Sequence, residues 1–435
     1  MRSSLKLLSI LFLMTGLIFS ACRDNTVEEE PGQNLNVKGI ITTNTTWLAK
    51  NKYVLEGFVY VEAGATLTIE PGTIIKGDKA TKASLIIKPG AKIIAEGTKD
   101  KPIVFTSNQA KGARNYGDWG GVVLLGRAPV NKTPATIEGE NVSTFGGTVA
   151  NDNSGILKYV RIEFAGVAFE TDKEINGLTF GGVGSGTVID FVQISFSGDD
   201  SYEWFGGSVN CNHLIAYKGL DDDFDTDWGY SGLVQYAFAF RDPRVADQCS
   251  CSDSNGFESD NDGTGSSATP QTNCRFANTT IMMSTGTPDA KYRSGFRIRR
   301  NSALSIYNSL VVGVYPRGLE LGDAATQANF TADRSDFRGL VLAGVTTAIS
   351  GGDATKLNLA ERQNKFGVEI STLGLPANYN AATGKPALLP TGASSLLTGG
   401  VTLPAGFARN TVVGAFGTTD WTDGWANWDP QNTDY

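Results

Sequence analysis

The chain has 435 residues with a formal net charge of −8, and 40% of its residues are hydrophobic and 19% charged. This acidic balance, with an isoelectric point near 5.0, argues against nucleic acid or an anionic lipid surface as a partner. Because the sequence holds 52 glycines and 22 phenylalanines, it is neither disordered nor helical in character and reads as rich in β-structure.

The first 22 residues have the features of a secretory signal peptide. A basic start precedes an apolar run over residues 7–19, which leads into Phe-Ser-Ala-Cys. The run is too short to span a membrane. Its end resembles the cleavage site of bacterial lipoproteins, which predicts that Cys22 is lipidated as the first mature residue. An ordinary signal peptide with a chance cysteine is the alternative. Residues 23–45 carry a run of three glutamates and are predicted to form an acidic tether.

Residues 46–350 carry a β-type repeat. The segments "IEPGTIIKG" and "IKPGAKIIAEG" lie about twenty residues apart, each with a Pro-Gly turn between apolar alternations. Looser copies are "LKYVRIEFAG", "IDFVQISFSG", "CNHLIAYKG" and "LVQYAFAFRD". We therefore predict an all-β fold, a right-handed parallel β-helix (a solenoid) in which each coil is three short strands. A β-sandwich would instead show antiparallel hairpins with Asn-Gly or Asp-Gly turns.

Residues 351–435 lose the repeat. They are predicted to form an irregular, aromatic-rich C-terminal cap on the open end of the solenoid, with a short helix near residues 354–364. Trp421 and Trp425 belong to the dense aromatic ending of the chain. A sugar-binding aromatic platform at these two tryptophans is the alternative.

The mature chain has four cysteines besides the predicted lipidation site: Cys211, Cys249, Cys251 and Cys274. An even number of cysteines in an exported chain predicts two disulfides. Because Cys249 and Cys251 are separated by a single residue, each is expected to bond to Cys211 or Cys274, and the pairing stays open. A zinc site is the competing interpretation, but Cys-x-Cys lacks the usual spacer between zinc ligands.

Four segments of the chain resemble a known family. They are "YVLEGFVYVEAGATLTIEPGTIIKG", "GDWGGVVLLGRAPVN", "SDSNGFESDNDGTG" and "GAFGTTDWTDGWANWDPQNTDY". Together they resemble a mostly uncharacterised family of Bacteroidetes outer-membrane lipoproteins with a pectate-lyase-like β-helix. The resemblance implies an outer-membrane location, with the protein anchored through a lipid on Cys22 and facing the cell exterior. It also implies an accessory role beside a TonB-dependent transporter, and a surface glycan is the other partner we expect.

The segment "LDDDFDTDWGY" at 220–230 has five carboxylates within seven residues. Read as a strand, it places Asp223, Asp225 and Asp227 on one face, where like charges repel one another. Aligning the coils adds charged residues of neighbouring rungs to the same outward column. The predicted column runs through Glu203, Asp225 and Asp227, Glu258 and Asp260, Arg297 and Arg299, and Glu320.

Two interpretations of this column require no catalysis. The first is a ladder of salt bridges between the acids of one coil and the arginines of the next, which contributes little at an exposed face. The second is calcium binding, because carboxylates in a glycine-rich loop are hard oxygen ligands that suit this ion. The candidate metal ligands are Asp223, Asp225, Asp227, Asp253, Glu258, Asp260 and Asp262.

Catalysis is the third interpretation. Pectate-lyase-like enzymes combine acidic calcium ligands with an arginine or lysine base, so the resemblance implies Arg297 or Arg299 as the base of a lyase. Ion pairing with carboxylates would strengthen the hold of a guanidinium on its proton, which argues against this role. A glycosidase that uses Asp225 and Glu258 has the residue types but no spacing evidence.

The sequence as a whole favours a cell-surface lipoprotein that binds a ligand or a partner without catalysis. The predicted ligand-binding residues are Glu203, Asp225, Asp227, Glu258, Trp421 and Trp425. The alternative is a polysaccharide-active enzyme, either a calcium-assisted lyase or a glycosidase, on the outer face of the β-helix.

Overall fold

The computed structural model describes residues 32–137, 139–140, 142–170, 173–248 and 253–435. The predicted signal peptide, Cys22, Cys249 and Cys251 lie outside the described residues. Residues 33–435 form one compact unit. Within the described ranges, no helix has both the length and the apolar character needed to cross a membrane.

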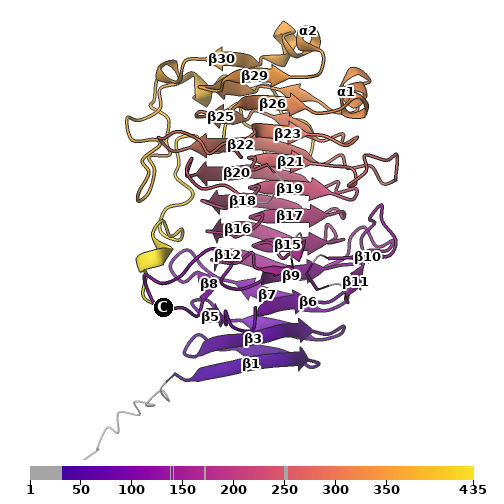
Figure 1. Ribbon diagram of the computed structural model, residues 1–435, viewed down its shortest axis with the longest axis vertical. Helices are drawn as coiled ribbons and strands as arrows, with labels where there is room; N and C mark the ends of the chain where they lie inside the picture. Colours follow the sequence, from indigo (N-terminus) through magenta and orange to yellow (C-terminus); the bar gives the residue numbers. More distant parts are fainter. Residues whose placement is uncertain (1–31, 138, 141, 171–172, 249–252) are drawn as a thin grey trace, which may run out of the picture. The chain divides into compact units, whose positions relative to one another are not determined.

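Parallel strands stack coil upon coil into a solenoid, which confirms the predicted right-handed parallel β-helix (Figure 1). Each coil passes through three faces, which we call the first, second and third face in chain order. Long strands bend at a corner and contribute to two faces: β1 (Asn34–Ile41), β3 (Lys52–Val61), β12 (Gly155–Glu163), β16 (Val188–Ser195), β18 (Asn210–Tyr217), β20 (Leu233–Arg241) and β22 (Arg275–Met283).

The remaining strands each belong to one face. The first face also contains β2 (Thr45–Trp47), β4 (Thr66–Ile69), β7 (Lys92–Glu96), β24 (Ser305–Tyr307) and β27 (Phe337–Arg338). The second face also contains β5 (Ile74–Gly77), β8 (Ile103–Ser107), β25 (Leu310–Val312), β28 (Val341–Ala343) and β30 (Lys365–Val368). The third face also contains β6 (Ser84–Ile87), β9 (Gly121–Leu125), β15 (Leu178–Gly181), β17 (Tyr202–Phe205), β19 (Phe224–Asp227), β21 (Phe257–Ser259), β23 (Ser294–Ile298), β26 (Arg317–Leu321) and β29 (Thr347–Ser350).

Short elements decorate the coils. Two antiparallel hairpins pair β10 (Ala135–Thr136) with β11 (Thr144–Phe145) and β13 (Ala168–Glu170) with β14 (Lys173–Glu174). Helical segments are α1 (Ala324–Thr331), α2 (Ala354–Leu357), η1 (Ala360–Arg362), η2 (Ile370–Thr372), η3 (Ser395–Leu397) and η4 (Pro430–Asn432). The helix predicted near residues 354–364 is therefore present as α2 followed by η1.

The corner between the first and second faces is made by residues with left-handed backbone angles. His213 has φ 51° and Tyr236 has φ 61°, a conformation that turns the chain without adding a loop. Their rings point outward and continue a stack that begins with Tyr159 and Phe191, with centroid separations of 4.5, 4.2 and 4.9 Å along the series. This stacking offsets part of the backbone strain and gives His213 a structural position.

The interior is a continuous apolar core that runs through the coils. Alternate residues of each strand point inward, so Phe224 and Phe257 of neighbouring coils lie against each other with ring centroids 5.2 Å apart. A few interior positions are polar and paired: Oγ1 of Thr226 donates to Oγ of Ser259 over 2.7 Å. These inward residues fix which side chains of the same strands face outward.

The solenoid begins earlier than predicted. Residues 34–41 form β1, which pairs in parallel with β3, although 23–45 were expected to be a tether. The repeat also continues beyond residue 350 to β30. The tether prediction was wrong for β1, where Leu35 and Val37 alternate with polar residues and pack against the core, so this strand does carry the apolar alternation of the later coils.

The predicted C-terminal cap is present in part, because α2 lies at the far end of the solenoid (Figure 1) and its Leu357 packs into the core. The later part of the C-terminal segment does not lie at that end. It runs back along the outside of the second face (yellow in Figure 1), and Tyr435 donates from Oη to Oε1 of Glu163 over 2.6 Å. The outward side chains of that face are apolar, including Phe238 and Phe240, and pack against Phe416 and Trp425. Covering this second apolar surface is the physical reason for the return path.

Candidate functional site

The predicted charged column exists on the third face. Glu203 of β17 lies in register with Asp225 of β19, which lies in register with Glu258 of β21. The register continues to Arg297 of β23 and Glu320 of β26. We call these five residues the acidic column. Because stacked strands are about 4.8 Å apart, neighbouring charges in it interact directly.

The arginine end of the acidic column is a network of salt bridges. Arg297 donates from Nη1 to Oε2 of Glu258 over 2.9 Å, and Arg299 pairs with both Glu258 and Asp260. Arg300 also pairs with Asp260, at 2.7 Å. These contacts agree with the salt-bridge interpretation at this end of the column, and they engage both Glu258 and Asp260, which were predicted metal ligands.

A second part of this network surrounds Glu320. Arg293 pairs with Glu320 at 2.7 Å and with Asp253 at 3.0 Å. Burial alone would raise the pKa of Glu320, but hydrogen bonds from Arg293 and Ser294 outweigh it and lower that pKa to about 2. Asp253, another predicted metal ligand, is thus held by an arginine.

The structure separates further predicted ligands from the column. Asp223 does not share a face with Asp225, because it precedes β19 and is fully buried against Arg241, 3.1 Å away; its predicted placement is wrong. Asp262 caps its own loop by accepting hydrogen bonds from the N–H groups of Thr264 and Ser266. Asp227 remains on β19, where it accepts a hydrogen bond from the N–H of Trp228 over 2.6 Å.

A compact group of carboxylates forms at the other end of the column. Asp200, Glu203 and Asp225 have carboxylate oxygens within 4.8 Å of one another, and so do Asp222, Asp225 and Glu258. We call these five residues the acidic cluster. A further group adds Asp199 and Asp221 beside Asp200. The fold therefore joins the predicted Glu203, Asp225 and Glu258 with four acids that were not predicted.

The four missed acids had a signal in the sequence. Asp199 and Asp200 follow the corner glycine Gly198, and Asp221 and Asp222 occupy the equivalent turn one coil later. The backbone N–H of Asp222 donates to Oδ1 of Asp200 over 2.8 Å, which joins the two turns. Aligning the turns as well as the strands would have placed these acids together.

Crowding and burial make the acidic cluster costly to ionise. Burial raises the pKa values of Asp200, Asp222 and Asp225 well above their ordinary range, and repulsion between neighbouring carboxylates adds to this. The pKa of Glu258 rises to about 8 for the same reasons, although Arg299 opposes the rise. Oδ1 of Asp225 is buried and accepts no hydrogen bond from a described residue. A proton or a cation would relieve this repulsion.

The donor set of the acidic cluster fits a hard cation. Every group in it offers a carboxylate oxygen, and calcium is bound in proteins by six to eight oxygen ligands in flexible arrangements. Asp222 and Asp225 of one coil could supply charged ligands together with Glu258 of the next coil, whose oxygens also pair with Arg297 and Arg299. Such a cation would replace the protons that the raised pKa values otherwise retain.

The environment of the predicted catalytic arginines makes them poor proton acceptors. Burial lowers the pKa of Arg299, but attraction by Glu258 and Asp260 outweighs it and raises that pKa above the ordinary value. Arg297 is mostly buried and pairs with Glu258 and Asp253. Both side chains hold carboxylates in place, which is a structural role.

The other predicted site residues lie elsewhere. Trp425 is buried against the second face, which contradicts an exposed sugar platform, and Trp421 is half-buried with Nε1 donating to the carbonyl of Ala415 over 2.9 Å. Cys211 and Cys274 are free thiols buried in the solenoid core. The prediction of disulfides through these two cysteines is therefore wrong. Both residues occupy inward-facing positions, so their sulfurs point into the interior of the solenoid.

Comparison with known proteins identifies the family to which the fold corresponds. Residues 39–383 match a family model described as "Pectate-lyase like beta helix domain". A similar solved structure is that of pectate lyase Pel9A, with 14% sequence identity, a TM-score of 0.43, and coverage of 85% of this chain and 88% of that one. At this identity and TM-score the likeness carries no functional argument. No curated protein sequence matches the chain significantly.

Proposed function

The chain belongs to the family with a pectate-lyase-like β-helix domain, and we propose that it is a non-catalytic binding protein whose acidic cluster holds calcium. The β-helix supplies a rigid surface, and the cation joins three consecutive coils of its third face. In this proposal the metal maintains the shape of the surface that a ligand or partner contacts. No covalent step is required of any residue.

The position of Asp225 carries this proposal. It lies between Glu203 and Glu258 in the strand register, and its buried Oδ1 accepts no hydrogen bond from a described residue. The arginines nearby are already committed to Glu258, Asp260 and Asp253 in the salt-bridge network. A cation at this point would satisfy the carboxylate at the centre of the cluster.

Calcium titration of the chelator-treated protein tests the proposal. At a hundred times its Kd, an ion that binds only the folded state adds about 2.7 kcal/mol to the free energy of unfolding. We expect calcium to raise the melting temperature of the wild type and of Asp434→Asn, a control with the same substitution at an exposed position. Asp225→Asn should lose most of the rise.

Proton release gives a second readout of the same experiment. Because the pKa of Glu258 is about 8, calcium binding at pH 7 should expel protons from the cluster. Calorimetry in buffers of different ionisation enthalpy would detect them. Wild-type protein that binds no calcium, or an Asp225→Asn variant that responds like the wild type, would contradict the proposal.

A polysaccharide-active enzyme is the second candidate. The observation in its favour is that burial and neighbouring acids raise the pKa of Glu258, which lies beside Asp225 in the strand register, and a raised pKa suits a general acid. Against it, Arg299 cannot accept a proton readily. Incubation with uronate polymers and neutral glycans should yield neither an unsaturated product nor new reducing ends. Turnover that Glu258→Gln abolishes would replace the binding proposal with this one.

The cellular location and partner are also proposals. The lipoprotein-like sequence around Cys22 and the acidic run after it support a lipid anchor in the outer membrane, facing the cell exterior, where a TonB-dependent transporter or a surface glycan would be the partner. Cys22→Ser should move the protein from the membrane fraction to the soluble one. Recovery of a transporter with the tagged wild-type protein, and not with Cys22→Ser, would identify the partner class.

A further inference from the structure

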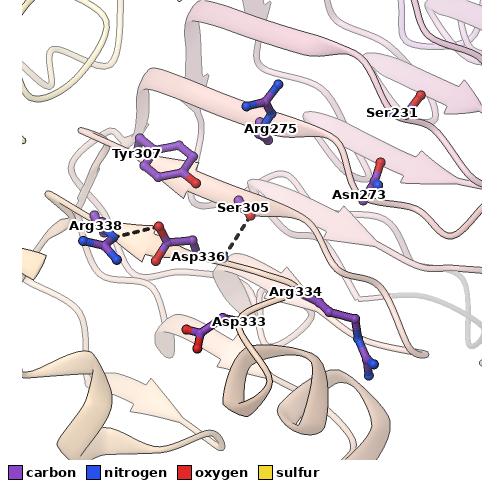
Figure 2. Close-up of a pocket in the computed structure, with 9 residues that line it drawn as sticks. All are labelled: Ser231, Asn273, Arg275, Ser305, Tyr307, Asp333, Arg334, Asp336 and Arg338. Atoms are coloured by element: carbon purple, nitrogen blue, oxygen red, sulfur yellow. Dashed lines mark hydrogen bonds and ion pairs between the residues drawn. The ribbon is translucent and has the colours of Figure 1, made fainter. Parts of the chain in front are cut away.

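A polar cavity of about 640 Å³ lies on the first face, away from the strands that carry the acidic cluster. Its arginines are Arg275 at the start of β22, Arg334 after α1, and Arg338 at the end of β27. In Figure 2 these three side chains lie on different sides of Ser305 and Asp336. We call this site the arginine cavity.

The strand register explains how distant residues meet in the arginine cavity. Arg275 lies in register with Ser305 of the next coil, and Tyr307 of that coil lies in register with Arg338 of the following one. The residue between each outward pair, such as Ile306, points into the core. Outward parity on successive coils therefore concentrates these side chains over one part of the first face.

The charge of the cavity is positive in a protein that is acidic as a whole. Its two carboxylates are already neutralised: Asp333 pairs with Lys356 at 2.7 Å, and Asp336 pairs with Arg362 at 2.5 Å and with Arg338 at 2.7 Å. Arg275 and Arg334 make no ion pair with any described residue. Two guanidinium groups thus remain available to an anion.

Both available guanidinium groups are held by protein contacts. Nε of Arg334 donates over 2.7 Å to Oδ1 of Asn329, and Asn329 is fully buried and donates from Nδ2 to the carbonyl of Ser302 over 2.9 Å. The guanidinium of Arg275 lies 6.0 Å from the ring centre of Phe407 in the returning C-terminal segment. Such pre-positioning lowers the entropy lost when a ligand binds.

The lining also fits a hydroxyl-rich ligand. Ser231, Asn273 and Ser305 offer hydroxyl and amide groups beside the arginines, and Tyr307, a residue that is 6% exposed, also lines the cavity. The volume lies within the range of small-molecule sites and greatly exceeds that of one inorganic anion. An apolar ligand would leave this polar lining without hydrogen bonds.

We propose that the arginine cavity binds a sugar that carries oxyanion groups, with Arg275 and Arg334 as its anion contacts. Guanidinium forks recognise sulfate, phosphate and carboxylate oxygens in pairs, while the serines and the amide contact sugar hydroxyls. The site is independent of the acidic cluster and needs no calcium.

Calorimetry with four probes at low salt tests this site and distinguishes the sources of the oxyanion. The probes are a sulfated disaccharide, glucose 1,6-bisphosphate, a galacturonate trimer and neutral maltotriose. We expect at least one anionic probe to bind and maltotriose not to bind, and the affinity to fall as salt rises from about 50 to 200 mM. The anionic probe with the lowest Kd identifies sulfate, phosphate or carboxylate as the group recognised.

Variants locate the binding. Arg275→Gln and Arg334→Gln should each raise the Kd about tenfold. Arg244→Gln, an exposed arginine paired with Asp242 elsewhere, should leave the Kd unchanged, and so should a chelator or Asp225→Asn. Circular dichroism would verify that each variant is folded. Failure of all three anionic probes at millimolar concentration, equal binding of maltotriose, or an equal loss in Arg244→Gln would overturn the proposal.

Discussion

Replacing Asp227 with asparagine tests the electrostatic account of the third face. Asp227 is half-buried on β19, and burial raises its pKa from 3.8 to about 8, with repulsion from Asp260 adding to the rise. The Asp227 carboxylate accepts the hydrogen bond from the N–H of Trp228. Asparagine has the same shape and can accept that bond with Oδ1, but it carries no charge at any pH.

The sign of the effect follows from proton binding. Between pH 4 and 8 the folded state holds a proton on Asp227 that the unfolded chain has released, so the stability of metal-free wild type falls as pH rises through this window. One pH unit corresponds to about 1.4 kcal/mol, which sets an upper limit of about 4 kcal/mol at pH 7. Because the side chain is partly exposed to solvent, which screens the repulsion, we expect about 1 to 2 kcal/mol.

Urea unfolding with chelator present measures this difference. At pH 7, Asp227→Asn should be more stable than the wild type by that amount, and at pH 4 the two proteins should have nearly equal free energies of unfolding. Asp434→Asn, at an exposed position, should follow the wild type at both pH values. A variant that is less stable than the wild type at pH 7, or a difference that is the same at both pH values, would refute the reasoning.

Two further predictions concern stability. Arg241→Met should lower the free energy of unfolding by about 3 to 5 kcal/mol, because it leaves the fully buried Asp223 carboxylate without its partner. In the same urea experiment, substitution of the exposed Arg244 by methionine should change the free energy of unfolding by less than about 0.5 kcal/mol. Equal effects of the two substitutions would contradict a stabilising Arg241–Asp223 pair. Trp425→Ala should loosen the returning C-terminal segment, since removing a buried tryptophan costs about 3 to 5 kcal/mol. Limited proteolysis should then cut this segment faster than in the wild type, whereas an unchanged cleavage rate would show that the tryptophan does not hold it.

The local sequence pattern was sufficient to predict the solenoid and the acidic column. Each coil alternates inward and outward residues, and the coils repeat with nearly constant length, so aligning the repeats already put Glu203, Asp225 and Glu258 in one column. The register of the strands confirms that alignment. Periodicity carries this information because the neighbours of a residue in a β-helix are its equivalents in adjacent coils.

Turns and long-range packing were decided by the tertiary structure. Asp223 leaves the column because it lies in the turn before β19, where strand parity does not apply, and Arg241 from a neighbouring coil neutralises it. The C-terminal segment follows the second face because that face is apolar on its outer side, and its return brings Phe407 beside Arg275. Strand periodicity by itself determines the faces of the coils, while the burial of charges and of exposed apolar surface determines which distant residues complete them.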